Sequence, residues 1–245
     1  MARQIQELGH DMLSRFNARF SGLAPAPFET EETSSPAAWA NMVTYEGDAI
    51  KLLVNRGEIV HYAYGWRGFL ALHEIGGHVL HFTQLLKHAV LRGAQPHALC
   101  LAIHTEDSYF IEGVAQFLTT LFADRLTEGP TPLHLDVARY ELSFALRHKN
   151  LTELIEGRIT IAEAAQRHQT YLGDEPGAMR RFYEALLRDV FLACQALVYY
   201  PSHQALLPAA TLPDQQLDGF VSELLSKPYD PVGLEDLVTN ALAAR

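Results

Sequence analysis

Residues 73–78 read His-Glu-Ile-Gly-Gly-His and lie between apolar runs. Two imidazoles and a carboxylate therefore fall within six residues. Many zinc sites use the pattern His-Glu-x-x-His, in which the two histidines lie four residues apart on one face of a helix. Here the second histidine comes one residue later. At roughly 100° per residue, an ideal α-helix turns about 140° past a full circle over five residues and points the two rings apart.

The glycine pair between the histidines offers a way to bring the rings together. A π-bulge absorbs one extra residue in a helix and is frequent at functional sites. Gly76 and Gly77 tolerate the unusual backbone angles that such a distortion needs. Each glycine costs roughly 1 kcal/mol relative to alanine inside a helix. We therefore predict a local π-bulge that points His73 and His78 at one metal ion, with an accidental match as the alternative.

The rest of the chain predicts a mainly α protein with a small β element just before the motif helix. Two short strands are expected, at residues 50–55 and 58–63, after a loop at residues 25–36. Thr160 and Glu163 form a candidate capping box, and Pro176 suits a first helical turn. Helical spacing of apolar residues predicts helices over residues 5–20, 66–86, 106–126, 135–146, 160–171, 176–199 and 231–243.

Length and composition favour a single domain with one sizeable core, or a core with a small appended lobe. The chain has 245 residues, of which 48% are hydrophobic. We divide the expected domain into three parts. Residues 1–44 form an N-terminal helix and loop, residues 45–126 form a metal-binding core, and residues 127–245 form a C-terminal helical part.

The charge and the cysteine content of the chain indicate which classes of binding partner and which cellular location to expect. The formal net charge of −10 argues against nucleic acid or an anionic membrane as the main partner. Cys100 and Cys194 both lie in apolar runs, which predicts buried thiols rather than a disulfide. The sequence shows no signal-peptide core and no apolar stretch long enough to span a membrane. We therefore expect a cytoplasmic protein.

A third metal ligand is expected from a helix downstream of the motif. Glu112 lies in the apolar run Phe-Ile-Glu-Gly-Val-Ala that begins at residue 110. Burying a carboxylate among apolar side chains costs free energy unless the carboxylate is paired or bound to a metal. A hydrolytic zinc ion takes three protein ligands and leaves a fourth position for water. The candidate ligands of one Zn²⁺ ion are thus His73, His78 and Glu112. The alternative is that Glu112 is solvated or paired with an arginine. The adjacent Gly113 would allow another helix or the metal to approach closely.

Two further polar residues near these ligands are candidates for supporting roles. His81 lies three residues after the motif and is expected at the surface or beside the ligands. Gln116 lies one turn after Glu112 and is expected to orient it.

Three segments together resemble a known family of metallopeptidases. They are His73–His78, residues 92–96 (Arg-Gly-Ala-Gln-Pro), and residues 112–115 (Glu-Gly-Val-Ala). This combination resembles the HExxxH zinc metallopeptidases of the tyrosine carboxypeptidase group. The group includes the microtubule-associated tyrosine carboxypeptidases and bacterial proteins named for a Gln-Glu-Gly-Leu-Ala motif. The resemblance implies a gluzincin-like core with zinc on His73, His78 and Glu112, and Glu74 as the general base.

The function that follows is hydrolysis of a peptide or amide bond, carboxypeptidase-like in its choice of bond. In such a reaction, zinc makes water acidic near neutral pH, and Glu74 passes the proton to the leaving amine. The expected substrate is a peptide or peptide-like molecule. It could pair as an added strand along residues 50–55, which include Leu53. Plain structural packing of that strand is the alternative.

An exopeptidase also needs a cation for the terminal carboxylate and a donor for the oxyanion. Arg180 and Arg181, followed by Tyr183, resemble the helix of the family that carries lysine and tyrosine, so these residues are candidates for substrate binding. Tyr200, in the pair Tyr199-Tyr200, is the candidate donor. The alternative for the two arginines is a solvated helix face, and the alternative for the tyrosines is a position at the rim of the core.

Other functions use the same donor set. Two histidines and one carboxylate also bind Fe(II) in non-haem oxygenases. A zinc amidase in small-molecule or peptide natural-product biosynthesis, and a non-catalytic protein that keeps the metal for stability, are further alternatives. The glutamate directly after the first histidine favours hydrolysis, because an oxygenase needs no base there.

Overall fold

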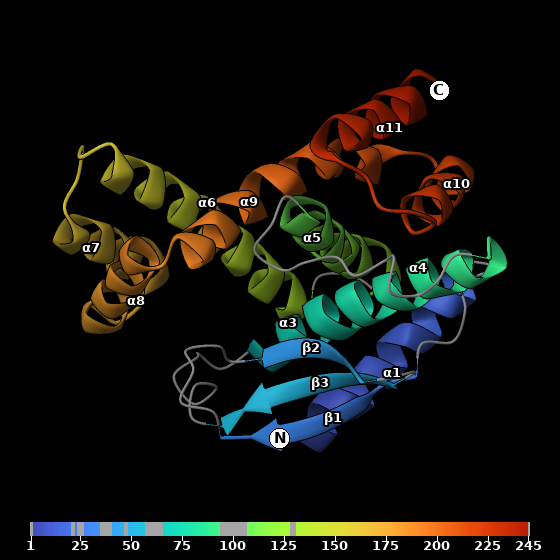
Figure 1. Cartoon of the computed structure of the whole chain (residues 1–245), viewed down its shortest axis with the longest axis horizontal. Coiled ribbons are helices and arrows are strands. Elements are labelled where there is room, and N and C mark those ends of the chain that lie inside the picture. Colours follow the sequence, from blue (N-terminus) through green and yellow to red (C-terminus); the bar gives the residue numbers. More distant parts are fainter. Residues whose placement is uncertain are drawn as a thin grey trace.

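The computed structural model describes residues 2–20, 23, 27–34, 41–46, 49–56, 66–93, 107–127 and 131–244. The protein is mainly helical with a small sheet (Figure 1), as the sequence predicts. The described helices are α1 (Ala2–Arg19), α3 (Trp66–Leu70), the π-helix η1 (Ala71–Val79), α4 (Leu80–Leu91), α5 (Asp107–Leu126), α6 (Pro132–Ile155), α7 (Ile161–Leu172), α8 (Pro176–Arg188), α9 (Val190–Leu206), the 3₁₀-helix η3 (Leu207–Thr211), α10 (Asp214–Leu224) and α11 (Pro231–Ala243).

The sheet has three strands in the order β1-β3-β2. Strand β3 (Ala49–Asn55) pairs in parallel with β1 (Glu29–Thr33) and antiparallel with β2 (Asn41–Glu46). Alternate side chains of β3 are buried in the core, as a strand with one covered face requires. The expected strand at residues 50–55 is confirmed. The expectation of a loop throughout residues 25–36 is wrong, because β1 lies within it, and the strand expected at residues 58–63 lies outside the described residues.

Most predicted helices are confirmed, and one is divided. The helix expected over residues 176–199 breaks at Asp189, whose backbone is extended. Its carboxylate accepts hydrogen bonds from the backbone N–H groups of Phe191 and Leu192 and so caps α9. The capping box of Thr160 and Glu163 is present at the start of α7. Helices η3 and α10 were not predicted.

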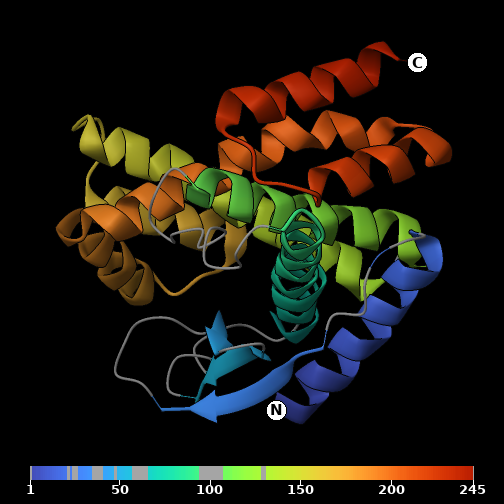
Figure 2. The ribbon, with the colours of Figure 1, turned by 45° about the vertical axis from the view of Figure 1, so that its right-hand side comes forward.

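The motif helix lies in the middle of the main core. In Figure 2 it is seen nearly end-on, with α1 and the sheet on one side and α5 on the other. Helix α5 also packs against α9, and a Cβ atom on Gly113 would lie 2.8 Å from Ser202 Cβ. This glycine therefore allows the close helix approach that the sequence predicts. A second, smaller hydrophobic cluster holds α6, α7 and α8 together (Figure 1).

Two expectations based on composition can be compared with the structure. Cys194 is exposed on α9, so the prediction of a buried thiol is wrong there, because the apolar run that carries it has one face outside the core. Cys100 lies outside the described residues. No helix in the described part of the chain has both the length and the apolar character needed to cross a membrane.

Candidate metal centre

The His-Glu-Ile-Gly-Gly-His motif lies on a π-helix, as predicted. All nine residues of η1 are buried. In a π-helix each turn closes between residues five apart, so His73 and His78 lie on the same side. Their ring centroids are 4.8 Å apart, and the ring planes are nearly perpendicular. The wider winding thus corrects the angular mismatch that an α-helix would impose on the motif.

Glu112 reaches the two histidines from α5. Its Oε2 lies 3.3 Å from Nε2 of His73 and 3.5 Å from Nε2 of His78. The three side chains are buried, and their ligand atoms all lie within 4.8 Å of one another. Oε2 makes no hydrogen bond within the described part of the chain. The ligand atoms of His73, His78 and Glu112 therefore face a common point, and Oε2 of Glu112 is not used in a hydrogen bond to either ring.

The two separations from Glu112 match those between ligands of one metal ion. With metal–ligand bonds of about 2.0–2.1 Å, two ligands at the tetrahedral angle lie roughly 3.3 Å apart, close to the two separations from Glu112. Two imidazoles and a carboxylate are also zinc's usual ligands in open, hydrolytic sites. The outer ring nitrogens, Nδ1 of His73 and of His78, are buried and have no hydrogen-bond partner among the residues that the structure describes. Those residues therefore do not fix the tautomer of either ring.

The charges in the cluster favour a cation. Burial alone lowers the pKa of His78, but the neighbouring charges of Glu112 and Glu74 outweigh burial and raise it. Burial alone raises the pKa of Glu112, yet His78 and His73 hold that pKa far below its usual range. Glu74 is itself buried directly after the first histidine. Two carboxylates buried beside the imidazoles create a negative potential that a divalent ion would neutralise.

Helix α9 adds two residues to the cluster. The Nε2 of Gln195 donates to Oε1 of Glu112 at 3.3 Å and to the hydroxyl of Tyr199 at 3.2 Å. The Tyr199 ring lies 6.4 Å from the ring of His73. Burial, together with the charges of Glu112 and Glu74, raises the pKa of Tyr199 well above 10, so its hydroxyl keeps its proton.

The sequence prediction names Tyr200 as the donor, but the structure places Tyr199, and not Tyr200, beside the cluster. The Tyr200 ring contacts His148 on α6, with ring centroids 5.7 Å apart. Neighbouring residues on a helix point about 100° apart, so only one of two adjacent tyrosines can face the cluster. The signal that could have identified Tyr199 is its spacing of four from Gln195, which places two polar side chains on one face of an apolar helix.

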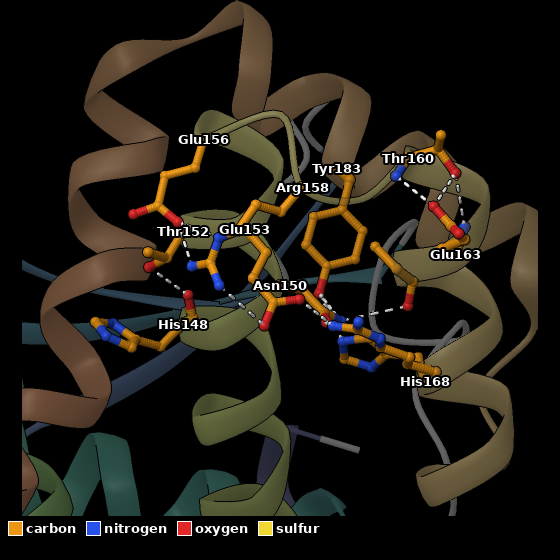
Figure 3. Close-up of polar contacts among 12 residues, drawn as sticks. His148, Asn150, Thr152, Glu153, Glu156, Arg158, Thr160, Glu163, His168 and Tyr183 are labelled. Atoms are coloured by element: carbon orange, nitrogen blue, oxygen red, sulfur yellow. Dashed lines mark hydrogen bonds and ion pairs between the residues drawn. The ribbon is translucent and has the colours of Figure 1, made fainter.

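The residues predicted to bind substrate from α8 do not join the cluster. Arg180 and Arg181 are exposed on α8. Tyr183 is fully buried, and its hydroxyl lies 3.0 Å from Asn150 Nδ2 and 2.8 Å from His168 Nε2 (Figure 3). It therefore links α8 to α6 and α7. The periodicity of α8 directs Tyr183 into the smaller hydrophobic cluster, which the sequence alone did not separate from the main one.

The predicted role of residues 50–55 is also wrong. Strand β3, which carries Leu53, is the central strand of the sheet. Leu53 pairs with Glu31 on one side and Met42 on the other. Both sets of backbone groups are therefore already used, and a substrate strand cannot be added along β3.

Two other expectations near the ligands can be compared with the structure. His81 is fully buried, with its ring stacked on Phe82 and edge-on to Phe110, which excludes the surface alternative. The alternative of a position beside the ligands stays open, because the charge of His78 acts on the pKa of His81. Burial lowers the pKa of His81 to about 3. Gln116 is buried, but its Nε2 has no partner among the described residues. The side chain that contacts Glu112 is Gln195, from a helix remote in sequence.

Comparisons with known proteins inform the fold alone. No family model matches the chain, and no curated protein matches it. The structure is similar to the crystal structure of a candidate lipoprotein from Colwellia psychrerythraea, with a TM-score of 0.76 and 17% sequence identity. The match covers 99% of this chain and 43% of that chain. This chain thus spans less than half the length of its structural neighbour.

Proposed function

We propose that the protein is a zinc-dependent hydrolase that cleaves a peptide or amide bond. The observation that carries the proposal is the convergence of His73, His78 and Glu112 on one point, with Glu74 buried directly after the first histidine. Three such ligands would leave a position on a bound zinc ion for water. A structural zinc site is usually closed and rich in cysteine, and this cluster contains none.

The side chains of the cluster divide the chemical roles. His73, His78 and Glu112 would hold the zinc ion, which would supply Lewis acidity to a carbonyl group and to water. Glu74 accepts a proton from the attacking water on its carboxylate and transfers it to the leaving amine. Tyr199 keeps its proton at neutral pH and can donate a hydrogen bond to the oxygen that becomes negative.

The finer parts of the proposal rest on the sequence resemblance. They are a gluzincin-like core and carboxypeptidase-like action, whereas the proposed cytoplasmic location rests on the composition of the sequence. The motif on a buried helix and the glutamate ligand on the downstream helix α5 are consistent with the first of these. Fractionation of the source cells, with detection of this chain, tests the location.

The experiment that tests the function has three measurements. The first is the metal content of protein purified without added metal, where we expect about one zinc ion per chain. The second is incubation of the zinc-loaded protein with a pool of peptides that differ at the C-terminus, with products identified by mass spectrometry. The third repeats both for Glu74→Gln, which should keep the zinc and lose the products.

Two results would contradict the proposal. Products that persist in Glu74→Gln would exclude Glu74 as the base, and a zinc-loaded protein that hydrolyses no peptide or amide would exclude the reaction class. Retention of iron instead of zinc, with activity that requires oxygen, would assign the same ligands to an Fe(II) enzyme.

A further inference from the structure

The two candidate metal-binding histidines lie in a symmetric pattern of aromatic residues. Phe69 precedes His73 by four residues, and Phe82 follows His78 by four residues. Residues four apart are neighbours on one face of a helix. Phe69 belongs to α3 and Phe82 belongs to α4, so each phenylalanine comes from one α-helical flank of the π-helix η1. The pattern therefore predicts one phenylalanine ring beside each ligand.

Each of these phenylalanine rings stacks on its neighbouring imidazole. The ring centroids of Phe69 and His73 are 5.4 Å apart, and the angle between the ring planes is 12°. The centroids of His78 and Phe82 are 5.9 Å apart, with an angle of 16° between the planes. The two imidazoles are themselves nearly perpendicular to each other. Each ligand therefore has its own stacking partner, one helical turn away in the chain.

The outer nitrogens of the two imidazoles make no hydrogen bond, within the part of the chain that the structure describes, that would orient the rings. A histidine that binds a metal almost always donates its second ring N–H to an acceptor, and this hydrogen bond fixes the ring. Nδ1 of His73 and Nδ1 of His78 are buried without such an acceptor among the described residues. The torsion about the Cβ–Cγ bond of histidine is intrinsically broad. Another contact must therefore limit the rotation of the two rings.

The phenylalanine rings are themselves fixed by further ring contacts. Phe69 stacks on Tyr140 of α6, with ring centroids 3.8 Å apart. Phe82 stacks on the buried ring of His81 at 5.7 Å, and His81 meets Phe110 of α5 edge-on. Rotation of a ligand imidazole about its Cβ–Cγ bond would turn its edge into a phenylalanine ring that is already packed. Stacking therefore supplies the restraint that the missing hydrogen bonds do not.

We propose that Phe69 and Phe82 are positioning residues, which hold the imidazoles of His73 and His78 toward the metal ion by ring stacking in place of outer hydrogen-bond acceptors. This inference rests on the metal centre of the proposed function, but it does not depend on hydrolysis. A stacked aromatic pair changes an equilibrium constant by about 2- to 12-fold. Loss of either phenylalanine ring should therefore weaken binding of the ion and alter the arrangement of its ligands.

The test measures metal binding in variants that lose one ring and keep an apolar side chain. Phe69→Leu and Phe82→Leu should each raise the dissociation constant for zinc, measured by chelator competition, by about 2- to 12-fold. Their Co²⁺-loaded forms should show shifted visible absorption bands, because these bands depend on the coordination geometry of the ion. Phe82→Tyr, which retains a ring at this half-buried position, should restore both the affinity and the spectrum.

Matched controls separate ring stacking on a ligand from a general loss of packing. Phe117 of α5 is buried and meets the ring of Phe220, and Phe182 of α8 is half-buried and meets the ring of Tyr183. Changing either phenylalanine to leucine should leave the zinc affinity and the Co²⁺ spectrum unchanged, although the first change should lower stability. If Phe69→Leu does not fold, the two variants of the half-buried Phe82 decide the question.

Leucine variants of Phe69 and Phe82 that bind both ions as the native chain does would overturn the inference. Equal losses in the two control variants, or a Phe82→Tyr variant that behaves as Phe82→Leu does, would overturn it as well. A native chain that binds neither Zn²⁺ nor Co²⁺ would reject the inference together with the metal centre. Failure of hydrolysis alone has a different signature, because the zinc-loaded protein then yields no products while loss of either stacked ring still weakens zinc binding.

Discussion

A Cβ atom placed on Gly77 would lie 2.8 Å from both the Cα and the Cβ of Ala115. The motif helix and α5 therefore touch at a residue that must have no side chain. Glu112 lies about one turn before Ala115 on α5, so this contact also sets the distance between Glu112 and the two histidines. The other glycine of the pair, Gly76, is less restricted, because its Cβ atom would meet Phe16 at an ordinary 3.5 Å.

Gly77→Ala should therefore weaken both the fold and the metal site. The added methyl group forces η1 away from α5, and overpacking of this kind costs about 1–3 kcal/mol. Urea unfolding of the metal-free protein measures the first effect, and competition with a zinc chelator measures the second. Gly76→Ala is the matched control and should retain stability and zinc affinity. Equal losses in both variants would show that backbone freedom of the glycines matters more than the contact.

Removal of the metal should lower the stability of the native chain, but it should not change the stability of a variant that has lost one metal ligand. At a zinc concentration about 1,000 times the dissociation constant, binding to the folded state alone contributes about 4 kcal/mol to the free energy of unfolding. Dialysis against a chelator should remove that contribution, which thermal or urea unfolding detects. Glu112→Gln should unfold identically with and without the chelator. If the chelator does not change the stability of the wild-type chain, the result argues against a metal site at His73, His78 and Glu112.

Gln195→Leu should reduce zinc affinity without changing the ligands themselves. The hydrogen bond from Gln195 Nε2 fixes Oε1 of Glu112, and loss of such outer contacts typically costs 10–100-fold in metal affinity. The dissociation constant for zinc, measured by chelator competition, should rise accordingly. Gln204→Leu changes the same residue type at an exposed position of the same helix and should have no effect. If the two variants match, Gln195 does not orient Glu112.

His81 should make the metal-free protein sensitive to acid. Its pKa falls from the ordinary 6.5 to about 3 in the folded state, so above pH 6.5 both states are neutral and the residue contributes no pH dependence. Between pH 6.5 and 3 the unfolded state binds the proton first, and stability falls by up to about 1.4 kcal/mol per pH unit. His81→Phe, which keeps a ring against Phe82 and Phe110, should flatten this dependence. The measurement is the unfolding free energy at pH 7 and pH 5, with exposed His10→Phe as the unaffected comparison.

Tyr183→Phe tests whether α8 belongs to the site or only to the fold. The change leaves Asn150 Nδ2 and His168 Nε2 without their shared hydroxyl, which should cost about 1–3 kcal/mol of stability. Zinc binding and hydrolysis of the peptide pool should stay as in the native chain. A loss of hydrolysis at unchanged stability would instead support the sequence-based assignment of Tyr183 to substrate binding.

The ligands could be predicted from sequence because their signals are local. His73 and His78 lie in one short motif, and the glycine pair between them indicates the winding that brings them together. Glu112 stands out as an acid in an apolar helix. By contrast, Gln195 and Tyr199 contribute through a contact between helices remote in sequence, and one residue of error along α9 is enough to select Tyr200.

The sheet was less predictable for a related reason. Strand β1 reads Glu-Thr-Glu-Glu-Thr, which has no apolar alternation, and it is held by parallel pairing with the later strand β3. Only the folded arrangement shows that β3 is central and closed to a substrate strand. The break at Asp189 was missed because the apolar period continues on both sides of it.

The cluster draws its members from both halves of the polypeptide. Helix η1 begins at Ala71, and α9 ends at Leu206, so the segment between the first histidine and Tyr199 includes α5, α6, α7 and α8. No proteolytic fragment that lacks either end of this segment can retain the full set of side chains. Binding of an ion at full affinity would therefore report on the docking of α9 against η1 and α5, and a chain stalled part-way through synthesis would expose the histidines without the groups that complete their environment.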